Sequence, residues 1–315
     1  MALKDVKSRI GSIKNIQKIT RAMEMMSAAR LRRAEQRISV LRPYAGAIRR
    51  MTRQAADAAG SVPSVPILAQ RENEEKVALV LITADRGLAG AFNSQIIRAG
   101  VRRARELENE GKQVVWYATG RRGVSSLTFR GHEVAGSYTG FTERPAYSDA
   151  REVASDLMAA YVDGDVDRVE VIYNGYVSAL TQKLTQEVLL PLQEATILGE
   201  GEEEGDGDEG RRDGDGDGDG DGEAHDDGHH ALVEYEPEPE EILQRLVPAY
   251  VEISLYRALL ESAAAELGAR MTAMRNASEN AGDLIKEYTL QMNRERQAAI
   301  TQEIMEVVAG AESLT

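Results

Sequence analysis

Hydrophobic residues recur every three or four positions along the N-terminal end of the chain. They lie at Leu3, Val6, Ile10, Ile13, Ile16, Ile19, Met23, Met26, Ile38 and Leu41. This spacing places them on one face of a helix. We therefore expect one long helix over residues 1–59, which ends before the break at Gly60-Ser-Val-Pro63.

A longer pattern of the same kind occupies the C-terminal segment, residues 242–315. Its hydrophobic positions are Ala249, Ile253, Tyr256, Leu260, Ala263, Leu267, Met274, Ala277, Ala281, Leu284 and Tyr288. Arg270 interrupts the run, with Met271 beside it as a substitute, and Pro248 is expected in the first turn. The run covers about five heptads, which favours a coiled coil over an ordinary surface helix.

These two helices stand at opposite ends of one chain. They would pair most simply with each other, as an antiparallel coiled coil. A helical bundle and a parallel homodimeric coil remain alternatives on the periodicity alone.

The middle of the chain alternates between strand and helix patterns. Strands are expected at 76–83, 112–118, 168–173 and 182–190, the last as a candidate edge strand, and helices at 93–110 and 146–161. This alternation predicts a mainly parallel, Rossmann-like α/β domain over residues 75–198. The fold class is thus α/β, with a long antiparallel coiled coil attached.

The turn after the first strand, Asp85 to Asn93, resembles a phosphate-binding turn only in its glycines. The GxxxxGK[ST] and GxGxxG patterns are both absent, because Ala91 and Phe92 follow Gly90. We expect Gly87 and Gly90 to allow tight packing, and Asp85 and Arg86 to form a local ion pair.

Charge is distributed very unevenly. The formal net charge is −14, yet residues 200–241 alone hold 20 acidic residues against Arg211 and Arg212. Residues 1–53 carry 14 Lys and Arg against three acids. The glycine- and aspartate-rich insert 199–232 has little apolar surface to bury, so we expect a disordered, solvated loop there. Its Asp213–Gly218 repeat begins like a calcium loop but lacks the closing glutamate and the flanking helices.

Several classes of protein are excluded or disfavoured. The chain has no cysteine, which excludes disulfides and thiolate metal sites. The longest purely apolar run, 77–82, is far shorter than the ~20 residues of a membrane helix, and the N-terminus lacks the apolar core of a secretory signal. His132 is the only histidine outside the insert, so we expect a loop histidine and no catalytic triad. The pattern predicts no cofactor, no metal and no nucleic-acid partner.

The sequence resembles the gamma subunit of F-type ATP synthases. The segments that carry the resemblance are IKNIQKITRAMEMMSAARLRRA (13–34), TADRGLAGAFNSQI (83–96), YEPEPEEIL (235–243), ARMTAMRNASENAGDLI (269–285) and NRERQAAITQEIMEVVAGAES (293–313). It extends over the whole chain except about 199–232, where photosynthetic relatives carry a cysteine-containing regulatory segment.

The resemblance implies a rotating central stalk that couples proton translocation to ATP synthesis or hydrolysis and has no active site of its own. Its partners would be the alpha and beta subunits, the epsilon subunit and the c-ring. It would be a peripheral protein on the cytoplasmic face of the plasma membrane. By position in the motifs, Met23 would contact the lever segment of beta, and Arg296, Gln297, Thr301 and Glu303 a beta loop further along the shaft. The final turn, 304–314, would rotate in an apolar collar.

Two other functions are weighed against this one. A coiled-coil adaptor with an α/β head would explain the periodicity, and a nucleotide-dependent α/β enzyme would explain the glycine-rich turn. For the insert, an inert loop is favoured over a salt or cation sensor and over an electrostatic brake on beta.

Overall fold

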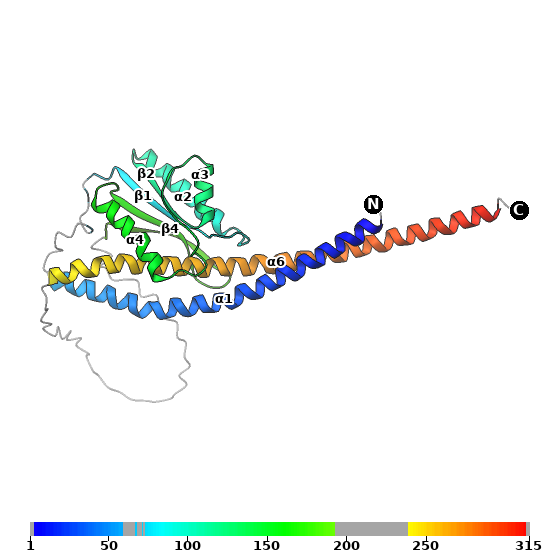
Figure 1. The fold of residues 1–315 in the computed structure, drawn as a ribbon, viewed down its shortest axis with the longest axis horizontal. Coiled ribbons are helices and arrows are strands. Elements are labelled where there is room, and N and C mark those ends of the chain that lie inside the picture. Colours follow the sequence, from blue (N-terminus) through cyan, green and yellow to red (C-terminus); the bar gives the residue numbers. More distant parts are fainter. Residues whose placement is uncertain (1–2, 59–66, 68–70, 72, 193–238, 313–315) are drawn as a thin grey trace, which may run out of the picture.

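The computed structural model describes residues 3–58, 67, 71, 73–192 and 239–312 of the 315-residue chain. The insert 199–232 therefore lies outside the described residues. Two very long helices, α1 (Leu3–Ala58) and α6 (Pro239–Glu312), run side by side and extend well beyond an α/β unit (Figure 1).

In the described part of the chain, the α/β unit is built on one five-stranded sheet. Its strands are β1 (Lys76–Ile82), β2 (Gln113–Thr119), β3 (Val134–Tyr138), β4 (Arg168–Tyr176) and β5 (Gln182–Leu190). The order across the sheet is β3-β2-β1-β4-β5. The first four strands are parallel, and β5 pairs antiparallel with β4 at the edge. The prediction of a mainly parallel sheet with an edge strand at 182–190 is confirmed.

Within the described residues, three helices accompany the strands: α2 (Phe92–Asn109), α3 (Arg121–Phe129) and α4 (Tyr147–Val162). The sequence prediction missed α3 and β3. Both are short, and β3 is only partly buried, so its hydrophobic pattern is weak. His132 lies in the loop between them, as expected, with its ring 5.1 Å from that of Trp116.

The central strand β1 separates two hydrophobic cores, because successive side chains point to opposite faces. Ala78, Val80 and Ile82 face α4 and α6. Val77, Leu79 and Leu81 face α2 and α3. Six consecutive residues of this strand are buried, which is typical of a parallel sheet covered on both faces.

One glycine of α2 sets how closely that helix approaches the sheet. A Cβ on Gly100 would lie 2.5 Å from the Leu81 side chain, closer than any real contact. Gly90 has a positive φ of 56°, as a turn residue requires. Of the two predicted packing glycines, Gly90 thus serves the turn and Gly87 lies against the Arg122 side chain, whereas close approaches of a helix to the sheet occur at Gly100 and at Gly123 of α3.

The C-terminal helix departs from the prediction at its start. It begins at Pro239, so Pro248 lies inside the helix rather than in its first turn. A proline in a helix interior removes a backbone hydrogen bond. Val247 and Val251 on either side are fully buried against the sheet core, and this packing holds the helix together across the proline.

Candidate functional site: the shaft and its junction with the sheet

The two long helices form an antiparallel coil. Leu31, Ala34 and Ile38 of α1 share a buried cluster with Leu260, Ala264 and Leu267 of α6. Further along, the Gln17 amide donates to the Ser278 carbonyl at 3.2 Å, and Arg275 pairs with Glu24 at 2.9 Å. Lower residue numbers in α1 therefore contact higher residue numbers in α6, so the two helices run in opposite directions.

The C-terminal end of α6 projects past α1. Gln17 lies 14 residues from Leu3, the first helical residue of α1, and the same count along α6 from Ser278 reaches Met292. Every residue from Arg296 to Ala309 is exposed. We call 293–312 the overhang; it forms the narrow end of the molecule in Figure 1.

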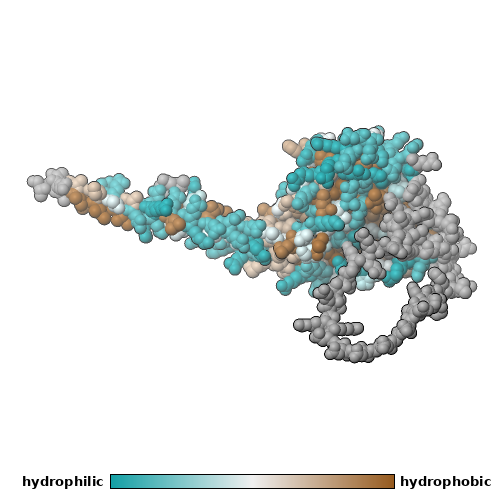
Figure 2. Space-filling model, turned by 180° about the vertical axis from the view of Figure 1, so that it is seen from behind, coloured by the Kyte–Doolittle hydropathy of each residue, from teal (hydrophilic) through white to brown (hydrophobic). Residues whose placement is uncertain are grey.

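Hydrophobic side chains remain exposed on the overhang. Ile304, Met305 and Val307 are 57%, 65% and 72% exposed. Figure 2 shows hydrophobic patches along this narrow end. Contiguous exposed apolar surface in a soluble protein marks an interaction site.

Part of the seam between the helices is polar. The buried face of α1 passes through Gln17, Thr20, Glu24 and Ser27, which lie three or four residues apart in phase with Ile10 and Leu31. Each of these side chains forms a polar contact: Thr20 and Ser27 donate to carbonyls of their own helix, and Gln17 and Glu24 bond to α6.

The predicted seam is therefore wrong between residues 16 and 26. Ile16, Ile19 and Met26 are 51%, 59% and 54% exposed. The heptad phase fixed by the apolar segments on either side rotates these three side chains outward. On α6 likewise, Leu284 is 42% exposed, and Ile285 occupies the inner position.

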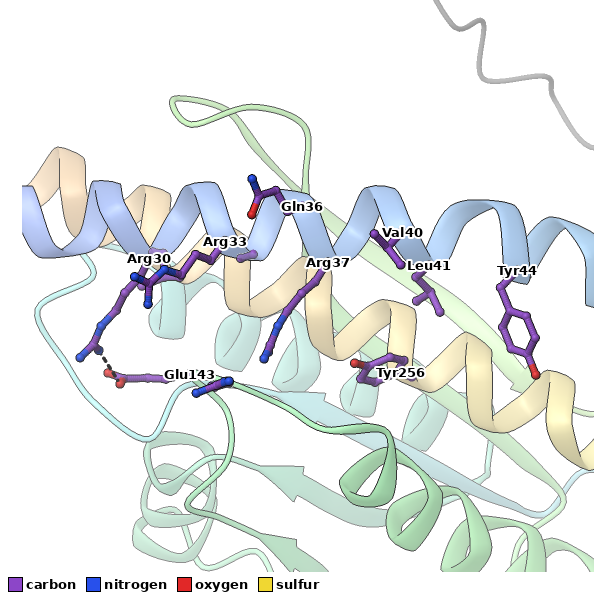
Figure 3. A pocket seen from close by; sticks show the side chains of 12 residues that line it. Arg30, Arg33, Gln36, Arg37, Val40, Leu41, Tyr44, Glu143 and Tyr256 are labelled. Atoms are coloured by element: carbon purple, nitrogen blue, oxygen red, sulfur yellow. Dashed lines mark hydrogen bonds and ion pairs between the residues drawn. The ribbon is translucent and has the colours of Figure 1, made fainter.

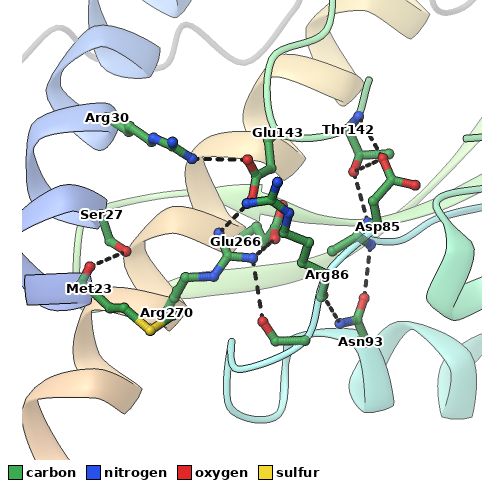
Figure 4. Close-up of polar contacts among 12 residues, drawn as sticks. Met23, Ser27, Arg30, Asp85, Arg86, Asn93, Thr142, Glu143, Glu266 and Arg270 are labelled. Atoms are coloured by element: carbon green, nitrogen blue, oxygen red, sulfur yellow. Dashed lines mark hydrogen bonds and ion pairs between the residues drawn. The ribbon is translucent and has the colours of Figure 1, made fainter. Parts of the chain in front are cut away.

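A junction of charged residues ties both long helices to the α/β unit (Figure 4). Its centre is Glu143, in the loop between β3 and α4. The Glu143 carboxylate pairs with Arg30 of α1 at 2.9 Å, with Arg270 of α6 at 3.3 Å and with Arg86 of the β1–α2 turn at 3.4 Å. One carboxylate thus connects three separate parts of the chain.

The most buried pair of the junction lies on α6. Arg270 is 6% exposed and pairs with Glu266, which is 1% exposed, one helical turn away. Arg270 also donates to the Gly87 carbonyl at 3.4 Å. Burial raises the pKa of Glu266 to about 7, with Glu143 adding to the rise and Arg270 opposing it.

Asp85 organises the turn beside this junction. Its carboxylate accepts from the backbone N–H groups of Arg121, Gly140 and Thr142, and from the Thr142 hydroxyl. The predicted ion pair between Asp85 and Arg86 is therefore wrong: Arg86 pairs with Glu143, and Asp85 lies 3.9 Å from Arg121. Asp85 and Arg86 thus each hold their turn against neighbouring loops of the chain.

The predicted contact residues fall in two places that the structure does not bring together. Met23 is half-buried on α1, one turn from Ser27, whose hydroxyl donates to the Met23 carbonyl at 2.8 Å. Arg296, Gln297, Thr301 and Glu303 are all exposed on the overhang. The Thr301 hydroxyl donates to the Gln297 carbonyl, and among the described residues neither Arg296 nor Glu303 forms an ion pair.

Sequence reasoning missed Glu143 and Glu266 altogether and read Arg270 only as an interruption. A signal was present: Glu266 and Arg270, four residues apart, are charged residues inside an otherwise apolar run, as a buried pair would be. Within 3–58, 73–192 and 239–312, no group of His, Cys, Asp and Glu side chains could hold a metal ion, and no described helix is long and apolar enough to span a membrane.

Comparison with known proteins identifies the family. A family model described as ATP synthase matches residues 2–314. The ATP synthase gamma chain of Frankia casuarinae is 41% identical over 316 residues, covering 99% of this chain and 97% of that relative. The gamma chain of Rubrobacter xylanophilus is also 41% identical, over 314 residues, with 99% and 98% covered. The chain belongs to the ATP synthase gamma chain family.

Solved structures agree on the fold. A chain of the Euglena gracilis mitochondrial ATP synthase, from an OSCP/F1/c-ring assembly, matches with a TM-score of 0.66 at 20% identity, covering 99% of this chain and 94% of that one. A chain from the central stalk and c-ring of the Tetrahymena thermophila mitochondrial enzyme matches with a TM-score of 0.57 at 23% identity, over 82% and 99%. The expected coiled coil attached to an α/β domain is confirmed.

Proposed function

We propose that this chain is the rotating central stalk of an F-type ATP synthase, coupling proton translocation to ATP synthesis or hydrolysis on a hexamer of alpha and beta subunits. The observation that supports this most directly is the asymmetric shaft. One helix of the coil outruns the other, so a hexamer around it would meet a different surface in every direction.

The junction at Glu143 suits the same role. Each proton that crosses the membrane supplies ~2.3 kcal/mol per 100 mV, and the stalk must transmit several protons' worth as torque. A carboxylate that pairs with arginines of α1, α6 and the β1–α2 turn resists rotation of the coil relative to the sheet.

The contact residues have distinct roles in this proposal. Met23, beside the exposed Ile19 and Met26, would contact the lever segment of beta. Arg296, Gln297, Thr301 and Glu303 would bond a beta loop ~30 Å further along, at ~1.5 Å per helical residue. The apolar end of the overhang would turn inside an apolar collar.

We further propose that the chain itself is not catalytic. The glycine-rich turn has no lysine or hydroxyl placed for phosphate, and Asp85 is held by backbone N–H groups. The α/β unit would instead lie against the epsilon subunit and the c-ring, making the chain a peripheral protein on the cytoplasmic face of the plasma membrane.

Co-expression with the alpha and beta subunits tests the proposal. The chain should co-purify with them, and a probe fixed to the α/β unit should rotate when ATP is added. If the chain fails to assemble with these subunits, the proposal is wrong.

The same preparation tests the rival functions. A coiled-coil adaptor would give a stable particle without alpha and beta subunits, whose helices join two copies. A nucleotide-dependent enzyme would bind nucleotide as the isolated chain. The proposed stalk should do neither.

A further inference from the structure

A groove of about 890 Å³ lies between α1, α6 and the loop that carries Glu143 (Figure 3). It does not include the predicted contact residues. Along α1 it runs from Arg30 to Tyr44, and its α6 side is formed by Tyr256 and Leu267. Its chemistry changes from one end to the other.

One end of the groove is strongly basic. Arg30, Arg33, Arg37 and Arg144 line it, and among the described residues of its lining Glu143 is the only acidic one. That carboxylate is already shared among Arg30, Arg86 and Arg270. Among the described residues, Arg33, Arg37 and Arg144 form no ion pair. This end therefore carries positive charge that the described chain does not neutralise.

The other end is apolar. Val40 and Tyr44 are 77% and 55% exposed, and Leu41 and Tyr256 line the groove between them. In Figure 3 Tyr44 lies at the far end of the groove from Arg30. An occupant that fits both ends would present acidic groups to the arginines and apolar groups to Val40 and Tyr44.

The chain itself contains a segment with this order of chemistry. Residues 213–227 hold eight acidic residues and no lysine or arginine, and Ala231, Leu232 and Val233 follow. We propose that this segment, 213–233, docks in the groove of its own chain, with the acidic part against the arginines and residues 231–233 against Val40 and Tyr44.

The length of chain fits this arrangement. Tyr256 lies 17 residues from Pro239, the start of α6, and Leu267 lies 28. At ~1.5 Å per helical residue these are ~26 and ~42 Å. A strand at ~3.3 Å per residue covers them in ~8 and ~13 residues.

The direction fits as well. Counting back from Pro239, ~8 residues reach Ala231, and ~13 residues reach Asp226, by the extended-chain length above. The apolar residues thus arrive at the apolar end of the groove, and the acidic ones at the basic end. A segment tethered at this distance has an effective concentration in the millimolar range, which favours it over a free competitor.

Disulfide trapping in the full chain tests the docking, because the natural sequence has no cysteine. The variant Val40→Cys/Ala231→Cys places one thiol in the groove and one in the segment. The matched control is Ser39→Cys/Ala231→Cys, since Ser39 is exposed at the same height of α1 but does not line the groove. With oxidised glutathione as the oxidant, we expect the groove pair to form an intramolecular disulfide about tenfold faster than the control, because the tether gives both pairs the same local concentration and only docking holds residue 231 beside residue 40.

Charge reversal supplies the second arm. Arg33→Glu/Arg37→Glu should lower the trapping rate to that of the control pair, whereas Arg32→Glu/Arg42→Glu, on α1 outside the groove, should leave it high. Raising the salt to 1 M, where the Debye length is ~3 Å, should also lower it. The neutral variant Arg33→Gln/Arg37→Gln, with helix content checked, replaces the reversal if the latter unfolds.

Three results would overturn the proposal. Equal trapping of the Val40 and Ser39 pairs would mean that the segment does not choose the groove. Equal effects of the two charge reversals would mean general attraction to α1. A disulfide between two chains in place of one within a chain would assign the groove to a second copy. None of these results depends on the alpha or beta subunits, so the proposed stalk function stands or fails separately.

Discussion

The two halves of α6 have opposite relations to the rest of the molecule. From Leu243 to Arg270 the helix lies between α1 and the sheet, and its residues enter all three hydrophobic cores. Beyond Met292 it has neither neighbour among the described residues, and its apolar side chains are exposed. One continuous helix therefore serves as an anchor at one end and as a presented surface at the other.

The two halves of α6 thus separate stability from recognition: the packed half holds the fold together, and the exposed half presents a surface. A helix that is buried all round gains its stability from packing, whereas an isolated helix depends on weak intrinsic propensity. The anchor should tolerate few substitutions, and the overhang should tolerate many without loss of folding. Substitutions matched in chemistry, one in each half, test this separation.

The largest effect is expected from Arg270→Met in the anchor. Breaking a buried ion pair by removing one partner costs ~3–5 kcal/mol, because the other charge is left unpaired. Here Glu266, 1% exposed, would be that charge. Urea unfolding of the full chain at pH 8 should show the loss, and Arg294→Met, at an exposed site of the overhang, should cost less than ~0.5 kcal/mol. Equal losses in both variants would contradict the separation.

A purely apolar pair of substitutions should give a slightly smaller contrast. Leu260→Ala removes a buried side chain from the cluster shared with Leu31 and Ile38, at an expected cost of ~2–5 kcal/mol. Leu290, on the same helix, is 62% exposed. Leu290→Ala should change the unfolding free energy by less than ~0.5 kcal/mol. A large loss there would mean that the outer part of α6 is also packed.

The anchor should also make stability depend on pH. Since burial raises the pKa of Glu266 from 4.5 to about 7, the folded chain holds a proton that the unfolded chain releases between these values. The contribution of Glu266 to the unfolding free energy is complete below pH 4.5 and is lost as the pH rises to about 7, at ~1.4 kcal/mol per pH unit. The difference in unfolding free energy between the natural chain and Glu266→Gln, measured from pH 4 to 8, should follow this curve. A flat difference would contradict it.

Much of this fold could be predicted from the sequence. The hydrophobic periodicity predicted both long helices, and the apolar run at 76–83 predicted the central strand. The expected replacement of Arg270 by Met271 in the buried face is wrong, because Arg270 is itself buried and paired with Glu266. Short elements such as β3 could not be found, because a half-buried strand of five residues has too little pattern. The start of α6 was missed because Pro248 reads locally as a helix start and is kept inside the helix only by tertiary packing.

The junction and the polar seam show the remaining limit. Glu143 is a single glutamate in a loop, and nothing in its neighbourhood indicates that three arginines converge on it. Between Ile16 and Met26 the most hydrophobic stripe is not the buried one, because the seam's phase is set by apolar residues on either side. Periodicity can identify a helix with confidence while the face that it buries is decided elsewhere in the fold.

The smallest predicted effect tests that polar seam. Glu24 is 22% exposed in its side chain and pairs with Arg275, which is 50% exposed. An ion pair of this exposure contributes only ~0.2–1 kcal/mol, and Glu24→Gln should cost no more than that. Glu24→Leu should restore the unfolding free energy that Glu24→Gln loses, since an apolar side chain at this position would pack in the seam one turn before Ser27. Urea unfolding of the two variants at 0.1 M and 1 M salt measures both effects, and the Glu24→Gln loss should shrink at the higher salt. If Glu24→Leu instead destabilised the coil as strongly as Leu260→Ala, the seam at this height would depend on its polar contacts, and the contrast between a packed anchor and a loosely held outer shaft would fail.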